Sequence, residues 1–293
     1  LFPQPSAQTR EARGLHQKDG LPSTTADVLQ SSNGRNHAMN DPMCIHSTAT
    51  TPLMWKPVVK TLGLTAQMPA NLGYPPNAPL PRGAPFSMED DLSNLTAQLP
   101  SDGPIDLIAH SYGGLLALHL TRRLGGRVRS LFLYEPVLFG SLVRSSHVPE
   151  VAQSARLFLD HEWFLSDSRG GSEEWLEQFV DYWNRPGSWA RAPEPVKVFS
   201  RSVGWKAFCE VRAVFFESLD FEEYRFDGVD ITLARGGRSP RESRAMVDEL
   251  QRVNPHAWLA ELPEAGHMAP ISDPAAVAQL YAAHRERVAA KHQ

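Results

Sequence analysis

The residues whose types and spacing best fit a catalytic role lie around Ser111. Residues 105–114 read Ile-Asp-Leu-Ile-Ala-His-Ser-Tyr-Gly-Gly, and an apolar stretch resumes at residues 115–120. An apolar run that stops at a serine between small residues and then resumes predicts a strand, a sharp turn and a helix, the arrangement called a nucleophile elbow. The turn strains the serine backbone and needs small neighbours, which Ala109 and Gly113 provide. A serine presented in this way can attack a carbonyl carbon once a base takes its proton.

Two further residues of catalytic type follow predicted strands. Glu135 comes directly after the β-forming run at residues 128–134, and His267 comes shortly after a second run at residues 257–262. Because ligands collect at the carboxyl ends of parallel strands, we expect Glu135 at the same sheet edge as Ser111. A histidine can pass a proton between reacting groups near neutral pH, and a carboxylate can hold its ring.

Predicted strands and helices alternate along most of the chain. These elements must position Ser111, Glu135 and His267. Helices are expected between strands that we place at residues 43–46, 62–66, 105–110, 128–134, 230–234 and 257–262. This alternation predicts an α/β fold, with a mostly parallel sheet covered by helices on both faces. A Pro- and Gly-rich passage at residues 69–85 is expected to be a surface loop.

The alternation also suggests how the chain divides. Residues 39–137 and 227–293 form the predicted core, and the aromatic-rich helical residues 138–226 form a predicted lid. Within the lid, Ser172 is expected to cap a helix whose aromatic residues share one face. Residues 1–38 are rich in Ser, Gln, Asn, Gly and Thr without an apolar period, so we expect a leader, a tag or a disordered segment.

Composition excludes several classes of partner. The charged fraction is 21% and the formal net charge is −4, which leaves no basic face for nucleic acid or an anionic membrane. Cys44 and Cys209 have neither metal-ligand nor redox spacing, so we expect buried free thiols and no metal site. No apolar run reaches membrane-spanning length, and no secretion signal begins the chain, which favours a cytoplasmic protein.

From Met39 to the C-terminus, these features together resemble the α/β-hydrolase superfamily, in particular its lid-bearing serine esterases. The resemblance is carried by the elbow, by the loop His46-Ser47-Thr48 after the preceding strand, and by Gly266-His267 after the last strand. It implies that Ser111 is the nucleophile and His267 the general base, with no cofactor. Members of this superfamily generally begin with two more strands, which residues 1–38 do not show.

The resemblance does not by itself identify the catalytic acid. Some members carry it at the tip of the strand after the elbow helix, where this chain has Glu135. Most carry it in the turn after the penultimate strand, where residues 236–239 read Gly-Gly-Arg-Ser and Ser239 stands in its place. A hydroxyl cannot balance an imidazolium charge, which favours Glu135, with Glu242 as the alternative.

The resemblance also implies an oxyanion hole made of two backbone N–H groups, those of Tyr112 and Thr48. Ser47 stands where these proteins usually have glycine, which leaves open the backbone shape of this loop.

The function implied is a serine-dependent hydrolase that cleaves carboxylic esters through an acyl-enzyme. Small apolar esters are the expected substrates, because such pockets are lined by apolar and aromatic side chains. Hydrolysis of thioesters, lactones, amides or carbon–carbon bonds uses the same triad and stays an alternative. A non-catalytic ligand-binding member is the other alternative, since Ser47 and Ser239 depart from the family pattern.

Overall fold

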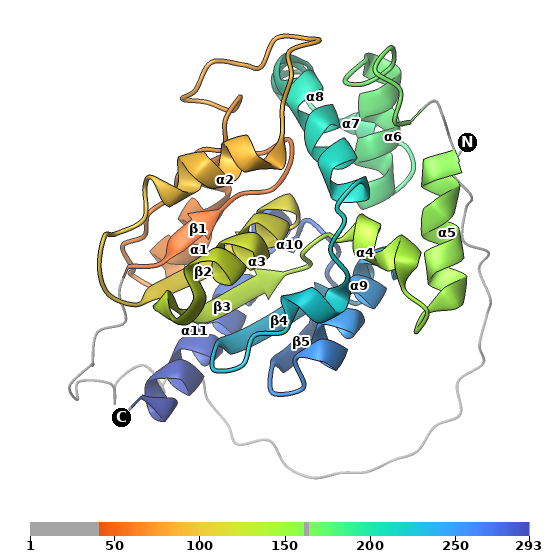
Figure 1. Ribbon diagram of the computed structural model, residues 1–293. Coiled ribbons are helices and arrows are strands. Elements are labelled where there is room, and N and C mark those ends of the chain that lie inside the picture. The colour runs from red at the N-terminus through yellow and green to blue at the C-terminus, as the bar shows by residue number, and fades with distance from the viewer. Residues whose placement is uncertain (1–40, 161–163, 293) are drawn as a thin grey trace, which may run out of the picture. The chain divides into compact units, whose positions relative to one another are not determined.

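A parallel sheet of five strands forms the centre of the part of the chain that the structure describes (Figure 1). The computed structural model describes residues 41–160 and 164–292, so the segment 1–38, predicted as a leader, tag or disordered tail, lies outside the described residues. The strands pair in chain order: β1 (Met43–Ile45), β2 (Ile105–His110), β3 (Val128–Tyr134), β4 (Asp230–Gly236) and β5 (Trp258–Leu262). The predicted α/β fold with a parallel sheet is confirmed.

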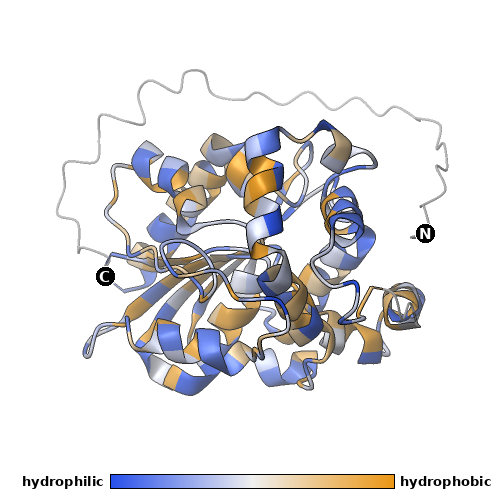
Figure 2. Cartoon of the chain, turned by 90° about the horizontal axis from the view of Figure 1, so that it is seen from above, coloured by the Kyte–Doolittle hydropathy of each residue, from blue (hydrophilic) through white to orange (hydrophobic). Residues whose placement is uncertain are grey.

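Helices cover both faces of this sheet (Figure 1). On one face α1 (Lys56–Thr61) packs against α11 (Pro274–Lys291), and on the other α3 (Tyr112–Leu124) and α9 (Arg241–Val253) contact the strands. Apart from the α-helices between β3 and β4, the remaining elements are α2 (Met88–Thr96), α10 (Ala269–Ser272) and the short 3-10 helices Pro52–Trp55, Gly125–Arg127 and Phe221–Tyr224. Figure 2 shows hydrophobic and hydrophilic residues along the same helices, as in amphipathic helices that cover a core.

The core explains the apolar runs in the strands. Every residue of β2 is buried, as expected for a strand with helices on both sides. Beneath α1 and α11, the side chains of Trp55, Phe132 and Tyr281 belong to one buried cluster. This packing fixes the strands, and with them the loops at their carboxyl ends.

In the described residues between β3 and β4, five α-helices precede the 3-10 helix Phe221–Tyr224: α4 (Phe139–Arg144), α5 (Pro149–Asp160), α6 (Glu173–Trp183), α7 (Ser188–Arg191) and α8 (Glu194–Phe215). Ser172 caps α6 as predicted, because its hydroxyl oxygen accepts the N–H of Trp175 at 3.3 Å. The last of these helices, α8, begins at Glu194, where Pro195 suits the first helical turn.

The predicted strand at residues 62–66 is wrong. These residues form a turn and an extended stretch, in which Gly63 takes a left-handed backbone with a φ of 61°. Leu62, Leu64 and Ala66 do alternate, but they pack against the core cluster beneath α1 and α11. The alternation of apolar residues therefore arises because one side of this segment is buried, although the segment is not a strand of the sheet.

β1 lies at one edge of the described sheet. Gln67 partly covers this edge, because its carbonyl oxygen accepts the N–H of Cys44 at 2.7 Å and its own N–H donates to Pro42 at 2.9 Å. The Cys44 thiol is buried as predicted, whereas Cys209 is only partly buried; both are free.

Candidate active site

Ser111 stands at the sharp turn between β2 and α3. Its backbone has φ 56° and ψ −123°, and its N–H donates to the carbonyl oxygen of Tyr134 at 3.2 Å. A Cβ at Gly113 would lie 2.6 Å from two carbonyl oxygens of β1 and the loop after it, closer than side chains tolerate. The requirement for a small residue two positions after the serine therefore comes from the adjacent strand.

Two hydrogen bonds join Ser111 to a histidine and a carboxylate. The Oγ of Ser111 lies 3.0 Å from Nε2 of His267, and Nδ1 of His267 lies 2.7 Å from a carboxylate oxygen of Glu135. Because a carboxylate only accepts, Nδ1 carries the hydrogen, and Nε2 is free to accept the serine proton. All three side chains are at most 5% exposed.

Glu135 is held as an ionised carboxylate by its surroundings. It follows β3 with a φ of 44°, and its oxygens accept the N–H of Gly236 at 2.6 Å and the hydroxyl of Ser243 at 2.8 Å. Burial alone would raise the pKa of Glu135, but the hydrogen bond and charge of His267, with further hydrogen bonds, keep this pKa below its usual value.

Glu242, the alternative acid, lies elsewhere. Its carboxylate accepts the hydroxyl of Ser154 at 2.6 Å and that of Tyr182 at 3.3 Å. Ser239, at the commoner acid position of the family, is buried in the turn after β4. The structure therefore brings Glu135, and not Glu242, to the histidine.

The loop after β1 lies beside Ser111. Thr48 and Ser111 line the same cavity, and the N–H of Tyr112 is at the first turn of α3, where backbone donors have no acceptor within the helix. Both predicted N–H groups thus come from elements next to the serine. Ser47 fits this loop despite its side chain, because the left-handed position falls at Ala49, with a φ of 55°.

Positive φ angles outside glycine are concentrated at this site. Among the non-glycine residues that the structure describes, they occur at Ala49, Ser111 and Glu135. Each such residue costs about 1–3 kcal/mol and persists only where its surroundings fix it. Strain gathered at one place is typical of a functional site.

Two neighbouring histidines stay neutral and fix the loops. His46 donates from Nδ1 to the carbonyl oxygen of Ser47 at 3.0 Å and accepts the N–H of Asn71 at 3.0 Å, and burial lowers its pKa to about 3. His110 lies 2.8 Å from the carbonyl oxygen of His267, and burial, then the charge of His267, hold its pKa well below the usual value. Neither histidine was predicted to support the site, although His46 begins the loop named above and His110 stands next to Ser111.

A small apolar cavity opens onto Ser111. Its volume is about 30 Å³, which is room for roughly two water molecules. On one side the indole of Trp183 stacks on the imidazole of His267, with ring centroids 3.8 Å apart. The residues that line the cavity are Thr48, Ser111, Val137, Phe139, Phe158, Phe164, Phe179, Tyr182, Trp183, Val211, Val214 and Phe215.

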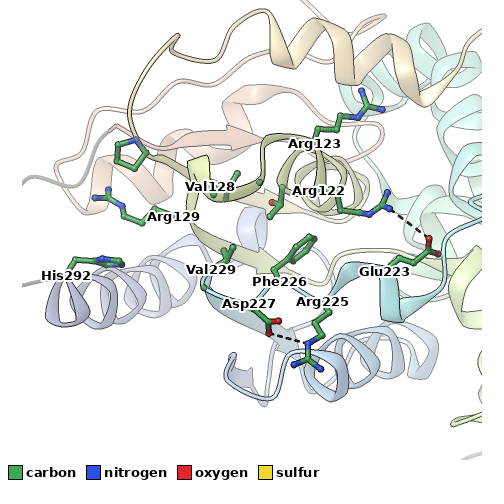
Figure 3. A pocket seen from close by; sticks show the side chains of 15 residues that line it. Arg122, Arg123, Val128, Arg129, Glu223, Arg225, Phe226, Asp227, Val229 and His292 are labelled. Carbon is green, nitrogen blue, oxygen red and sulfur yellow. Dashed lines mark hydrogen bonds and ion pairs between the residues drawn. The ribbon is translucent and has the colours of Figure 1, made fainter.

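A larger groove of about 850 Å³ lies at the opposite end of the strands, beside Val128 and Val229 (Figure 3). Its cationic side chains have carboxylate partners, such as Glu223 for Arg122 and Asp227 for Arg225. The charges of this groove are therefore balanced within the protein.

Metal sites and membrane-spanning helices are both absent from the described residues. No group of three or more His, Cys, Asp or Glu residues in residues 41–160 and 164–292 could hold a metal ion. Within the same ranges, no helix has the length and apolar character needed to cross a membrane.

Comparison with known proteins places this geometry in a family. Over 244 residues the chain is 25% identical to the pimeloyl-[acyl-carrier protein] methyl ester esterase of Neisseria meningitidis, covering 81% of this chain and 90% of that protein. It is 38% identical to the lipase LipV of Mycobacterium tuberculosis over 68 residues, which span 22% of this chain and 26% of LipV. A solved structure from a study of carboxylesterases of Nitrososphaera gargenis superposes with a TM-score of 0.62 at 15% identity, covering 86% and 92% of the two chains. The model of the alpha/beta hydrolase family matches residues 43–280, and the chain belongs to that family.

Proposed function

We propose that this protein is a serine hydrolase that cleaves carboxylic esters through an acyl-enzyme on Ser111. The observation that carries the proposal is the pair of hydrogen bonds from Ser111 to His267 at 3.0 Å and from His267 to Glu135 at 2.7 Å. A nucleophile, a base and an orienting carboxylate in this order are what acyl transfer requires.

In the first half of the reaction, Nε2 of His267 takes the hydroxyl proton as Oγ of Ser111 attacks the carbonyl carbon. The oxyanion that forms would receive hydrogen bonds from the N–H groups of Thr48 and Tyr112. The imidazolium of His267 is stabilised by Glu135, and it then gives its proton to the departing alcohol. The ester C–O bond breaks, and the acyl group stays on the serine.

In the second half, a water molecule attacks the acyl-enzyme while His267 takes its proton. The second tetrahedral intermediate uses the same two N–H groups. When it collapses, His267 returns the proton to Oγ of Ser111, and the carboxylic acid leaves. No cofactor enters either half of this proposed cycle.

The apolar cavity favours an apolar acyl group, because its walls are aromatic and aliphatic. A volume of about 30 Å³ is too small for an acyl chain, since pockets that hold drug-sized ligands measure roughly 300 Å³ or more. We therefore propose that residues 138–226 act as a lid over a core of residues 39–137 and 227–293, and that lid side chains move when substrate enters.

A fluorophosphonate probe tests the proposal, because it reacts only with an activated serine. The wild-type protein should be labelled and should hydrolyse 4-nitrophenyl butanoate, whereas Ser111→Ala should do neither. Ser154→Ala is the matched control, since it removes another buried hydroxyl, one bonded to Glu242. An unlabelled wild-type protein that still binds apolar esters would favour the non-catalytic alternative. If the protein turned over a thioester or a lactone faster than 4-nitrophenyl butanoate, the proposed substrate class would change to that acyl bond.

A further inference from the structure

A lysine is completely buried next to the candidate active site. Nζ of Lys206, on α8, lies 2.7 Å from a carboxylate oxygen of Asp91 and 2.6 Å from one of Glu210. All three side chains have no exposed surface. Buried ion pairs seldom add stability over apolar packing, so stability alone does not account for this cluster.

The two carboxylates of this cluster each hold one side of the predicted oxyanion hole. Asp91 accepts the hydroxyl of Tyr112 at 3.1 Å, and Tyr112 would supply one of the two N–H groups. Glu210 accepts the hydroxyl of Tyr74 at 2.8 Å, and the oxygen of that hydroxyl accepts the N–H of Ala49 at 2.9 Å. Ala49 follows Thr48, which would supply the other N–H group.

Ala49 needs this support because of its backbone. Its φ of 55° lies in the left-handed region, which costs an alanine about 1 kcal/mol or more. Loss of the acceptor for its N–H would leave this strained residue with less support. The bond from Tyr74 to a carboxylate is charge-assisted, and such bonds are about twice as strong as neutral ones.

The segment that carries Tyr74 is itself anchored by two hydrogen bonds just before Tyr74. Asp91 accepts the N–H of Leu72 at 2.8 Å, and His46 accepts the N–H of Asn71 at 3.0 Å. The Tyr74 ring also meets the His46 ring edge-on, with centroids 5.0 Å apart. The hydroxyl of Tyr74 is therefore held at a fixed place beside Ala49.

We propose that Tyr74 and Glu210 are positioning residues that hold Thr48 and Ala49 in the shape of a working oxyanion hole. Lys206 neutralises the negative charge of the Glu210 carboxylate. This inference rests on the proposed function and adds a second role to α8, which also lines the acyl cavity. Tyr74 and Glu210 touch no reacting atom, so they act on the rate through the loop.

The test uses Tyr74→Phe in the full chain, which removes one oxygen and keeps the ring. With 4-nitrophenyl butanoate, kcat should fall by about tenfold to a hundredfold, somewhat less than the loss of an oxyanion donor itself, while KM stays nearly constant. The second-order rate of fluorophosphonate labelling should fall with kcat, because the phosphonyl oxygen uses the same N–H groups.

Tyr224→Phe is the matched control. The hydroxyl of Tyr224 is also buried, and it lies 3.1 Å from Nε2 of His119, whose other partner is Glu217. This variant should lose similar thermal stability and keep wild-type kcat. If Tyr74→Phe loses no more activity than Tyr224→Phe, the inference is overturned.

A rescue variant separates loop shape from general destabilisation. Glycine adopts positive φ at little cost, so Ala49→Gly in the Tyr74→Phe background should recover part of kcat. A double variant no faster than Tyr74→Phe would contradict the inference.

Wild-type protein gives a further measurement that does not depend on a folded variant. The Ala49 amide should exchange with solvent slowly, and an amide as exposed as those of surface loops would overturn the inference. A wild-type protein inert to both ester and probe refutes the proposed function and this inference with it. If the wild type is active and Tyr74→Phe loses no more kcat than Tyr224→Phe, only this inference is refuted and the proposed function stands.

Discussion

The indole ring of Trp183 stacks on the imidazole ring of His267, with centroids 3.8 Å apart and planes inclined by 24°. Trp183 is the last residue of α6, and it also contacts the rings of Phe139 and Tyr182 in the cavity wall. A residue of the segment between β3 and β4 thus covers one face of the histidine that meets Ser111.

Replacing Trp183 with alanine should enlarge the cavity and change chain-length preference. We expect the ratio of kcat/KM for 4-nitrophenyl octanoate to that for the butanoate to rise about tenfold, since extra methylenes in an apolar pocket are worth about 1–3 kcal/mol. Trp205→Ala is the control, because that indole donates to the carbonyl oxygen of Ala84, outside the cavity. Equal ratios in the two variants would contradict the cavity as the acyl site.

Loss of either partner of the Ser111–His267 hydrogen bond should abolish turnover. For Ser111→Ala and His267→Ala we expect esterase rates lower by about four or more orders of magnitude, with the fold retained. Steady-state kinetics with 4-nitrophenyl butanoate and a circular dichroism spectrum check both points. Turnover near that of the wild type in either variant would end the serine-hydrolase proposal.

The two glutamates near α9 should respond differently to the same change. Glu135→Gln places an amide against Nδ1 of His267 and removes the charge that balances the imidazolium, so kcat should fall on the order of ten-thousand-fold. Glu242→Gln affects a carboxylate bonded to Ser154 and Tyr182, and kcat should stay close to that of the wild type. A crippled Glu242→Gln with an active Glu135→Gln would reverse the assignment of the acid.

Buried histidines should make the fold sensitive to acid. Burial lowers the pKa of His284 from 6.5 to about 4, and among the described residues its Nε2 has no hydrogen-bond partner. Because the folded-state pKa is depressed, the stability it contributes is present above pH 6.5 and is lost as pH falls towards 4. The loss for this one group is at most about 3 kcal/mol.

Urea unfolding at a series of pH values measures this loss. In His284→Gln the free energy of unfolding should fall less between pH 7 and pH 4 than in the wild type, by up to about 3 kcal/mol. His147→Gln is the control, since that side chain is about half exposed. Parallel curves for the wild type and His284→Gln would show that His284 titrates normally.

The elbow could be predicted from sequence because its cause is local. A turn at Ser111 imposes small neighbours, and Gly113 meets that demand against β1. The place of Glu135 also followed from chain order, since consecutive strands of a parallel sheet put their ends at one edge. The supports of the site could not be predicted in this way. Ser243 bonds to Glu135 across 108 residues, and Tyr74 bonds to Glu210 across 136.

The Pro- and Gly-rich passage at residues 69–85 illustrates the difference. Its composition predicts a surface loop, and it does lack regular structure, yet Tyr74 and Asn71 within it are fully buried. Turn-forming residues determine where the backbone bends, whereas burial depends on which distant elements pack above it.

The attachment of α8 sets a boundary for redesign of this protein. α8 carries Lys206 and Glu210 into the buried ionic cluster, while α5, α6 and α7 carry no residue of that cluster. A chimera that exchanges α5 to α7 with those of another family member could therefore alter selectivity and leave the reaction machinery supported. A chimera that also exchanges α8 would place a foreign helix against Asp91 and Tyr74, with the buried Asp91 carboxylate left without its cation. Crossover points for recombined variants thus belong before Glu194.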